Sequence, residues 1–420
     1  MKYDFLSIKM YDFRRFLLFA YAFLLPFTDW LSVKLNGIII ILLSALWLYD
    51  CCFIKQQKKK FVWNDFFILT GVFLIQLLSL LQGGATENIF SSILIKLPFL
   101  LFPIFFLRSK FGDRDLYLIK LFFFAGCFLS VLLSATFILL DHLNGTISIG
   151  NHNYESYLML HRPYYGIYLL TSVVLLMNEK RIRFLLISAG LFFILFLWFI
   201  QAKMACVILL VLLFIRLISF MQIRFRRLIV ISGMILCSIV FVWLLNYYFT
   251  NRGNADHLTP KMRFFILSIN TRLIHWDCGW RILGEHFVLG TGGGNIKNTL
   301  NACYQSNHAA VYRYVKDYNI HNEFLEESVR HGFVGLLIYI LCFFCFLKMA
   351  IKSADRNYLF FLIIVILASI TETTFSREQG VLMIAFFNTI LYLNNAHINQ
   401  QEDNLSQINM LSASASIGSK

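Results

Sequence analysis

The residues best able to do chemistry lie in one polar stretch of an otherwise apolar chain. Six of the ten histidines fall between His257 and His331, and a glycine-rich turn occupies residues 290–295. Within this stretch His321 begins a helical pattern in which His321 and Leu325 share one face. A histidine titrates near neutral pH and therefore suits general-base catalysis. Taken alone, His321 fits a structural role better than a catalytic one.

Three basic residues could bind a phosphate group. Arg272 precedes Trp276 by one helical turn, so the two share a face, and arginine makes bidentate bonds to phosphate. Lys203 occupies a very short outer turn between two apolar runs, and Arg162 stands at the entrance of another run. Ionisable groups near membrane depth are functional candidates. Plainer roles remain open, because Arg272 could bind lipid headgroups and Lys203 could anchor its helix at the interface.

Other motifs favour structural explanations. The 290–295 turn could cradle phosphate through its amides, but it lacks the Lys-Ser/Thr of a nucleotide-binding loop and equally fits a flexible turn. Asp113 and Asp115 match an acid-x-acid metal pattern, although Asp is also a favoured helix cap. Cys342 and Cys345 fall inside an apolar run and are interpreted as buried thiols. We predict no metal site and no cofactor.

The composition is that of a membrane protein. Hydrophobic residues make up 59% of the 420 residues and charged residues 14%, with mean hydropathy +0.69. Apolar runs such as 184–200 do not alternate with polar residues, which favours helices over a β-barrel. The net charge of +14 is interpreted as topology anchors rather than a nucleic-acid surface. The sequence predicts an all-α polytopic membrane protein.

The apolar runs also predict a domain layout. A span needs about 20 apolar residues, and the pattern predicts about twelve spans. The spans lie near 16–33, 36–53, 62–82, 89–107, 116–140, 159–177, 184–200, 204–221, 228–249, 333–350, 357–371 and 380–394. Residues 1–249 and 333–394 hold the spans, 250–332 form one large outer loop, and 395–420 form a disordered cytoplasmic tail.

Basic residues set the predicted orientation. Clusters of Lys and Arg fall in alternate connections, around residues 55–60, 108–114, 180–183, 216–227 and 348–356, whereas the short connections between them hold few. Since Lys and Arg in short loops resist translocation, the N-terminus is predicted to lie inside. Nine of the ten histidines then fall on the outer side. Chemistry on that side needs a substrate that arrives already activated, because ATP and nucleotide sugars are absent there.

Two of the nine cysteines lie in the outer segment. Cys278 and Cys303 could pair with each other if their compartment is oxidising. Separate free thiols are at least as consistent with the sequence.

The motifs in combination point to a family. Arg272-x3-Trp276, the glycine-rich turn, His321-Asn-x2-Leu325 and then Gly332-x2-Gly335 follow one another in order. This order resembles the O-antigen ligase and polymerase (Wzy-C-like) membrane family, over roughly residues 200 to 350. The resemblance implies a GT-C-like, metal-independent glycosyltransferase in the bacterial inner membrane, with its active site on the periplasmic side. Its substrates would be an undecaprenyl-pyrophosphate-linked glycan as donor and the lipid A–core as acceptor.

The resemblance also assigns roles to residues. The family's catalytic histidine falls on His321, the predicted base, and its loop arginine falls on Arg272. A second arginine of the family corresponds to Lys203, which keeps the charge and loses the two-pronged phosphate geometry. These two cations are expected to hold the donor pyrophosphate. Arg281, Arg162 and Asn322, which follows His321 in the motif, are the remaining predicted substrate contacts.

Three other functions stay open. A polymerase would pass the glycan to another lipid-linked repeat unit, and a protein O-glycan transferase of the same family would use a protein acceptor. A lipid-linked oligosaccharide transporter is the alternative from another class. Transporters show repeated halves with broken helices near mid-membrane, and the sequence has no such internal symmetry. The number of spans and the single outer loop favour the ligase, whose attack at the anomeric carbon would invert its configuration.

Overall fold

The chain is helical throughout the part that the structure describes. The computed structural model describes residues 2–30, 35–53, 62–83, 87–107, 112–145, 154–220 and 260–417. Every regular element in these ranges is a helix, which confirms the all-α prediction there. Short 3-10 turns join the α-helices, which are α1 (Lys2–Leu24), α2 (Leu35–Phe53), α3 (Trp63–Gly83), α4 (Glu87–Lys96), α5 (Pro98–Phe106), α6 (Asp113–Leu143), α7 (Arg162–Leu176), α8 (Arg183–Phe199), α9 (Lys203–Phe220), α11 (Pro260–Glu285), α12 (Ile296–Asn307), α13 (Tyr312–Val315), α14 (Glu323–Lys352), α15 (Arg356–Ser369) and α16 (Glu378–Ile417).

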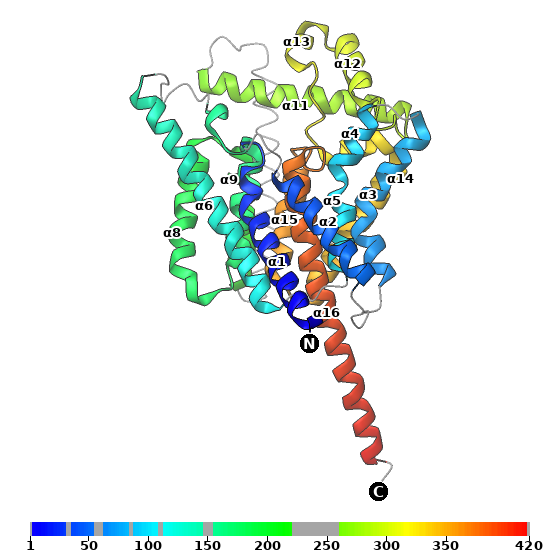
Figure 1. Ribbon diagram of the computed structural model, residues 1–420. Helices are drawn as coiled ribbons and strands as arrows, with labels where there is room; N and C mark the ends of the chain where they lie inside the picture. The colour runs from blue at the N-terminus through cyan, green and yellow to red at the C-terminus, as the bar shows by residue number, and fades with distance from the viewer. Residues whose placement is uncertain are drawn as a thin grey trace.

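Most helices run side by side as a bundle, and one helix lies across its end (Figure 1). α11 crosses the top of the bundle, with α12 and α13 above it, while both chain termini lie at the bottom. α16 passes through the interior, and most of its residues from Glu378 to Gln400 are buried. The described part of the predicted outer loop 250–332 thus forms α11 to α13 and the first turns of α14 at one end of the bundle.

Six helical stretches in the described ranges are long and apolar enough to cross a membrane. They are Trp63–Leu80, Ile89–Phe106, Asp113–Leu143, Lys180–Phe199, Glu323–Lys352 and Glu378–Gln400, and shorter apolar helices cover Leu35–Tyr49 and Arg356–Ser369. The predicted span 228–249 lies outside the described residues. The chain is therefore a helical membrane protein, and the count of about twelve spans stays a prediction.

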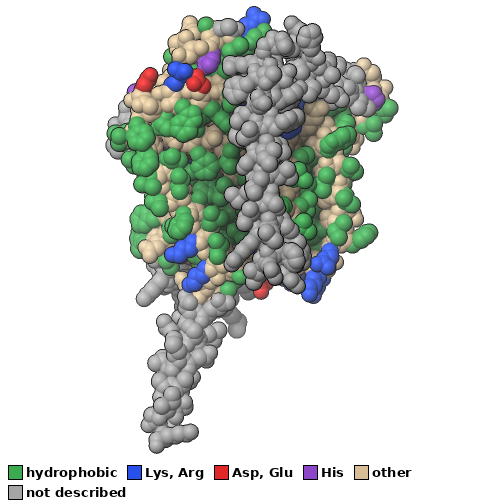
Figure 2. Space-filling view, turned by 180° about the vertical axis from the view of Figure 1, so that it is seen from behind, with side chains coloured by type: hydrophobic (Ala, Val, Ile, Leu, Met, Phe, Trp, Pro, Cys, Tyr) green, Lys and Arg blue, Asp and Glu red, His purple; other side chains and the backbone are tan. Residues whose placement is uncertain are grey.

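Apolar side chains cover the flank of the bundle (Figure 2). Phe184 is 85% exposed and Trp198 75% exposed, both on α8, which would be unfavourable in water. Figure 2 shows Lys and Arg at the lower edge of this apolar band, while acidic residues, basic residues and histidines gather at its upper end. This arrangement suits a helix bundle in lipid with polar rims on both sides.

The predicted span 89–107 consists of two helices. α4 ends at Lys96 and α5 begins at Pro98, because proline lacks the amide proton that would continue the helix. Lys96 is only 1% exposed and forms an ion pair with Glu327 of α14, whose other carboxylate oxygen accepts from Gln76 Nε2 at 3.3 Å. Removing one member of a buried pair is costly, so this network fixes the outer part of α14 against α3 and α4.

A kink at Gly332 divides α14. Gly332 has φ 65° and ψ −165°, a backbone conformation that essentially only glycine adopts. A side chain here would lie 2.2 Å from the Val288 carbonyl oxygen, and Phe333 N donates to the Phe287 carbonyl at 2.7 Å. The segment before α12 thus docks on the kink, which separates the outer turns of α14 from its apolar span.

The last helix extends past the predicted end of the final span. α16 runs to Ile417, through most of the 395–420 segment for which the sequence predicts a disordered cytoplasmic tail. An existing helix grows by one hydrogen bond for each residue fixed and needs no new nucleus. A polar composition that argues against independent folding therefore does not stop α16 from continuing.

Replacing Gly332 by alanine tests the importance of the kink. We expect the unfolding free energy to fall by about 1–3 kcal/mol or more, since the backbone conformation is strained for any L side chain and the methyl group would meet Val288. Thermal unfolding of the purified protein measures the change. Gly190→Ala is the matched control because nothing lies within 4 Å of that site. Equal unfolding temperatures for the two variants would contradict this account of the kink.

Candidate active site

One buried carboxylate joins the two residues that the motif order singles out. Glu372 Oε1 accepts from Arg272 Nη2 at 2.8 Å, and Glu372 Oε2 lies 3.2 Å from His321 Nδ1. The Glu372 side chain is 8% exposed, whereas His321 and Arg272 are 19% and 31% exposed. Three segments that are 51 and 100 residues apart therefore meet at one point, with the two partners of Glu372 still open to a ligand.

The backbone around His321 is held by its neighbours. His321 has φ 54°, a left-handed conformation that costs energy for a residue other than glycine. Ile320 N donates to Glu326 Oε2 at 3.1 Å, and Leu325 N donates to Asn322 Oδ1 at 3.0 Å. Asn322 is thus the N-cap of α14. The structure gives this predicted substrate contact a positioning role directly beside His321.

Opposing effects act on the Glu372 carboxyl. Burial raises its pKa, but the hydrogen bonds and charges of His321 and Arg272 outweigh burial, and the net result is a lowered pKa. Glu372 is therefore ionised at neutral pH. An ionised carboxylate at Nδ1 favours the histidine tautomer whose proton sits on Nδ1, which leaves Nε2 available as a base.

A second histidine packs against the first. The ring centroids of His275 and His321 are 5.4 Å apart, and His275 Nδ1 lies 2.9 Å from the Tyr304 hydroxyl. Burial, followed by the nearby charges of His321 and Arg272, lowers the pKa of His275 to about 3. His275 is consequently neutral at pH 7 and adds no positive charge beside His321.

Two of the remaining predicted cations lie in the same region. Burial, and then the charge of Arg272, lowers the pKa of Lys203, so these two side chains are electrostatic neighbours. Arg162 begins α7, which packs against α9 where Gly166 meets Ala205. Arg162 Nε lies 2.8 Å from Glu155, so this arginine already has an acidic partner. Lys203 is the one of these two cations with a shown electrostatic link to Arg272.

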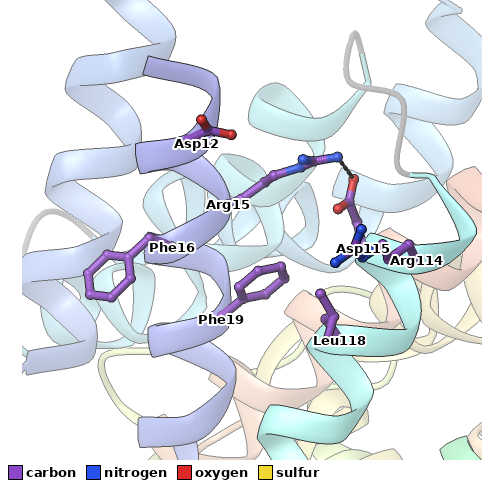
Figure 3. A pocket seen from close by; sticks show the side chains of 7 residues that line it. All are labelled: Asp12, Arg15, Phe16, Phe19, Arg114, Asp115 and Leu118. Atoms are coloured by element: carbon purple, nitrogen blue, oxygen red, sulfur yellow. Dashed lines mark hydrogen bonds and ion pairs between the residues drawn. The ribbon is translucent and has the colours of Figure 1, made fainter. Parts of the chain in front are cut away.

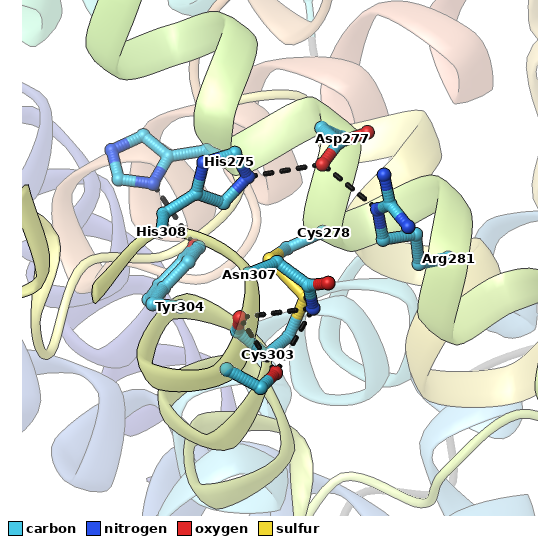
Figure 4. The surroundings of a disulfide bond; sticks show 9 residues. His275, Asp277, Cys278, Arg281, Cys303, Tyr304, Asn307 and His308 are labelled. Atoms are coloured by element: carbon cyan, nitrogen blue, oxygen red, sulfur yellow. Dashed lines mark hydrogen bonds and ion pairs between the residues drawn. A yellow bond between two sulfur atoms is a disulfide. The ribbon is translucent and has the colours of Figure 1, made fainter. Parts of the chain in front are cut away.

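Arg281 contacts a different group. Arg281 is 56% exposed and pairs with Asp277 at 2.9 Å, and Asp277 also lies 3.0 Å from His308 (Figure 4). Neither of these contacts leads to Glu372. The prediction of Arg281 as a substrate contact gains no support from its surroundings.

A disulfide ties α11 to α12 beside this group. Cys278 and Cys303 are bonded, with their Cα atoms 5.8 Å apart (Figure 4). This pairing resolves the alternatives that the sequence leaves open. Closing a loop of this length stabilises a fold by roughly 3 kcal/mol, which holds the helix that carries Arg272 and His275.

The acid-x-acid pattern belongs to the opposite end of the bundle. Asp115 Oδ2 accepts from Arg15 Nη2 at 2.8 Å, at the edge of a cavity of about 400 Å³ between α1 and α6 (Figure 3). Asp113 lies in the first turn of α6, where an acidic side chain is favoured. Among the described residues, no group of three or more His, Cys, Asp or Glu side chains is placed to hold a metal ion.

Residues 166–340 match the family model described as O-antigen ligase. These residues carry the O-antigen ligase domain of that family. No curated protein matches the chain. The matched segment includes Lys203, Arg272 and His321, whereas Arg162 and Glu372 lie outside it. The O-antigen ligase match thus covers Lys203, Arg272 and His321, and the structure adds Glu372 as the shared acidic partner of Arg272 and His321.

Glu372 is the candidate-site residue that sequence reasoning missed. It lies in the polar segment Thr371-Glu-Thr-Thr374 between two apolar runs. An acidic side chain in so short an outer connection is a usable signal, since a charge there needs a partner. The identity of that partner follows only from the fold, because Arg272 and His321 are distant in sequence.

The lowered pKa of His275 predicts a pH-dependent stability. The unfolded state binds a proton near pH 6.5 and the folded state only near pH 3, so stability is complete above about pH 6.5 and declines as the pH falls toward 3. From pH 6.5 to 5 the loss is at most about 2 kcal/mol. His275→Asn should flatten thermal unfolding over this range. The exposed His286, as His286→Asn, is the control, and an unchanged pH dependence in both variants would refute the assignment.

Proposed function

We propose that this protein is an O-antigen ligase that transfers a glycan from undecaprenyl pyrophosphate to the lipid A–core on the periplasmic face. The observation that carries the proposal is the bridge from Glu372 to both Arg272 and His321. It places a potential base next to a phosphate-binding cation in a partly open site. The family match supports ligase- or polymerase-type activity.

The donor is already activated in this scheme, because a pyrophosphate is a good leaving group. Arg272 and Lys203 would bind the pyrophosphate and stabilise the negative charge that grows on the leaving oxygen. Glu372 neutralises part of the charge on Arg272 and fixes the direction of its guanidinium. The remaining exposed part of Arg272 then faces the ligand.

The proposed reaction consists of one proton transfer and one displacement at the anomeric carbon of the donor sugar. His321 Nε2 takes the proton of an acceptor hydroxyl as that oxygen forms a bond to the anomeric carbon of the donor sugar. The bond from the anomeric carbon to the pyrophosphate oxygen breaks, and undecaprenyl pyrophosphate leaves with the electron pair. Glu372 stabilises the imidazolium that forms, as a carboxylate does in other catalytic triads. A single displacement inverts the anomeric configuration, and no step uses a metal ion.

Two features support an outer location for this site. The disulfide between Cys278 and Cys303 lies at the same end of the bundle as Arg272, and disulfides persist in oxidising compartments. The basic clusters of the short loops favour the opposite end for the cytoplasm. Undecaprenyl-linked glycans meet their acceptors on the outer side of the inner membrane, as the proposal requires.

His321→Ala in the native host tests the reaction and separates ligase from polymerase. For a ligase we expect long glycan chains to accumulate on the lipid carrier while the core at the surface stays bare. For a polymerase, core capped by a single repeat unit would appear, without long carrier-linked chains. Both glycolipid pools are measured by gel electrophoresis and mass spectrometry. Unchanged pools, at normal protein abundance, would overturn both activities, leaving a protein acceptor or transport to explain the family match.

Glu372→Gln tests the role of the carboxylate in purified protein. The amide keeps the shape of the side chain and loses the charge that orients and stabilises protonated His321, so kcat should fall by roughly 10²–10⁴-fold with little change in acceptor KM. The assay includes a chelator throughout. Glu285→Gln, an exposed acid at the end of α11, is the matched control. A Glu372→Gln protein with kcat near wild type would argue against this mechanism.

A further inference from the structure

A second polar cavity lies beside the proposed active site. It has a volume of about 180 Å³ and is bordered by α4, the glycine-rich turn, the first turn of α12 and residues 375–376. Sites for whole drug-sized ligands usually exceed roughly 300 Å³. This cavity suits one small group of a larger substrate, such as a phosphate on a sugar.

The charge of the lining favours an anion. Arg330 and Lys297 are basic, and the described residues that line the cavity include no acidic side chain. Arg330 is only 11% exposed, and Glu326 holds its guanidinium at 2.7 Å. Lys297 is 61% exposed and lies 3.3 Å from Asp317. A buried guanidinium with an exposed lysine on the same cavity is an arrangement that can bind phosphate.

Hydroxyl groups complete the lining. Ser92 Oγ accepts from Arg330 Nη1 at 3.4 Å, which directs the guanidinium along the cavity wall. Ser376 Oγ is buried and has no hydrogen-bond partner among the described residues. Leaving a buried polar group unsatisfied costs about 1–3 kcal/mol, which a ligand oxygen would recover. Ser376 therefore adds an unsatisfied hydroxyl to the lining of the cavity.

The glycine-rich turn forms one wall rather than a phosphate cradle. The Gly293 amide already donates to Ser79 Oγ at 3.0 Å, and a Cβ at Gly293 would come within 2.9 Å of that oxygen. The turn is further attached to α14 because Gly292 N donates to the Arg330 carbonyl at 3.0 Å. The turn is thus attached to the backbone of Arg330, so two walls of the cavity are fixed to each other.

We propose that this cavity binds a phosphate group carried by the acceptor saccharide, and that it thereby positions the acceptor for transfer. Glu372 and Ser376 lie in one short segment, four residues apart and at most about 14 Å along the chain. One end of the segment contacts His321 and the other lines the cavity. A phosphorylated sugar bound by Arg330 would place a neighbouring hydroxyl toward His321. This inference rests on the proposed function for the identity of the acceptor, and on the cavity alone for the binding of phosphate.

Binding is tested first without catalysis. The purified full-length protein is titrated with glucose 6-phosphate and with glucose while ³¹P line broadening or thermal stabilisation is followed. We expect glucose 6-phosphate to bind and glucose not to bind. Lys297→Ala and Ser376→Ala should each weaken the affinity for glucose 6-phosphate by roughly two- to tenfold. Lys316→Ala is the control, since Lys316 is exposed and lies outside the lining. These variants avoid the buried Arg330–Glu326 pair, whose loss could unfold the protein. Equal affinity of the wild type and the three variants for glucose 6-phosphate would overturn the proposed site.

Kinetics then identify which substrate carries the phosphate. Transfer is measured with a phosphorylated lipid A–core acceptor and with the same acceptor after phosphatase treatment. Lys297→Ala and Ser376→Ala should raise KM for the phosphorylated acceptor only, with kcat and donor KM unchanged. A raised donor KM instead would overturn the acceptor assignment in favour of the donor pyrophosphate. If the wild-type protein binds glucose 6-phosphate but transfers glycan to no acceptor, the proposed function would be overturned and the anion site would stand.

Discussion

The arrangement at the outer end of this protein depends on a single buried carboxylate. Glu372 is almost fully removed from solvent, and an unpaired charge in that position would be expensive. Its two oxygens are satisfied separately by Arg272 of α11 and by His321, which lies just before α14. The same contact therefore satisfies the buried charge and sets the distance between a cation and a base. Because the carboxylate is ionised, it also selects which nitrogen of His321 is free to accept a proton.

The remaining structure holds those three segments in place. α15 and α16 are largely buried, and the short connection between them carries Glu372. α11, which carries Arg272, lies across the end of the bundle and is tied to α12 by the disulfide. The kink at Gly332 lets the segment before α12 dock against α14, whose outer turns are fixed by the buried pair of Lys96 and Glu327. The proposed acceptor cavity forms where these fixed parts meet, so its shape follows from the same contacts.

Much of this could be predicted from the sequence, and the reasons for the failures are physical. Hydropathy predicts a helical membrane protein because lipid forces backbone groups to bond within each segment. The order of the motifs selects His321 and Arg272, which the structure brings together through Glu372. Glu372 itself was missed because a contact across 51 or 100 residues leaves no periodicity in the sequence. The pairing of Cys278 with Cys303 depends on spatial neighbours, and α16 continues because an existing helix needs no new nucleus. Arg281 stays a prediction, because it lies on the helix that carries Arg272 but pairs there with Asp277.

A double-mutant cycle on His321 and Glu372 tests the central claim most directly. Initial rates of glycan transfer by purified protein give kcat/KM for wild type, His321→Ala, Glu372→Gln and the double variant, with long incubations to quantify the residual activity. If Glu372 acts through His321, the double variant should be no slower than His321→Ala alone, because residues that act as a unit are strongly non-additive. Losses that multiply would contradict the account, since they would show that the carboxylate and the histidine act independently.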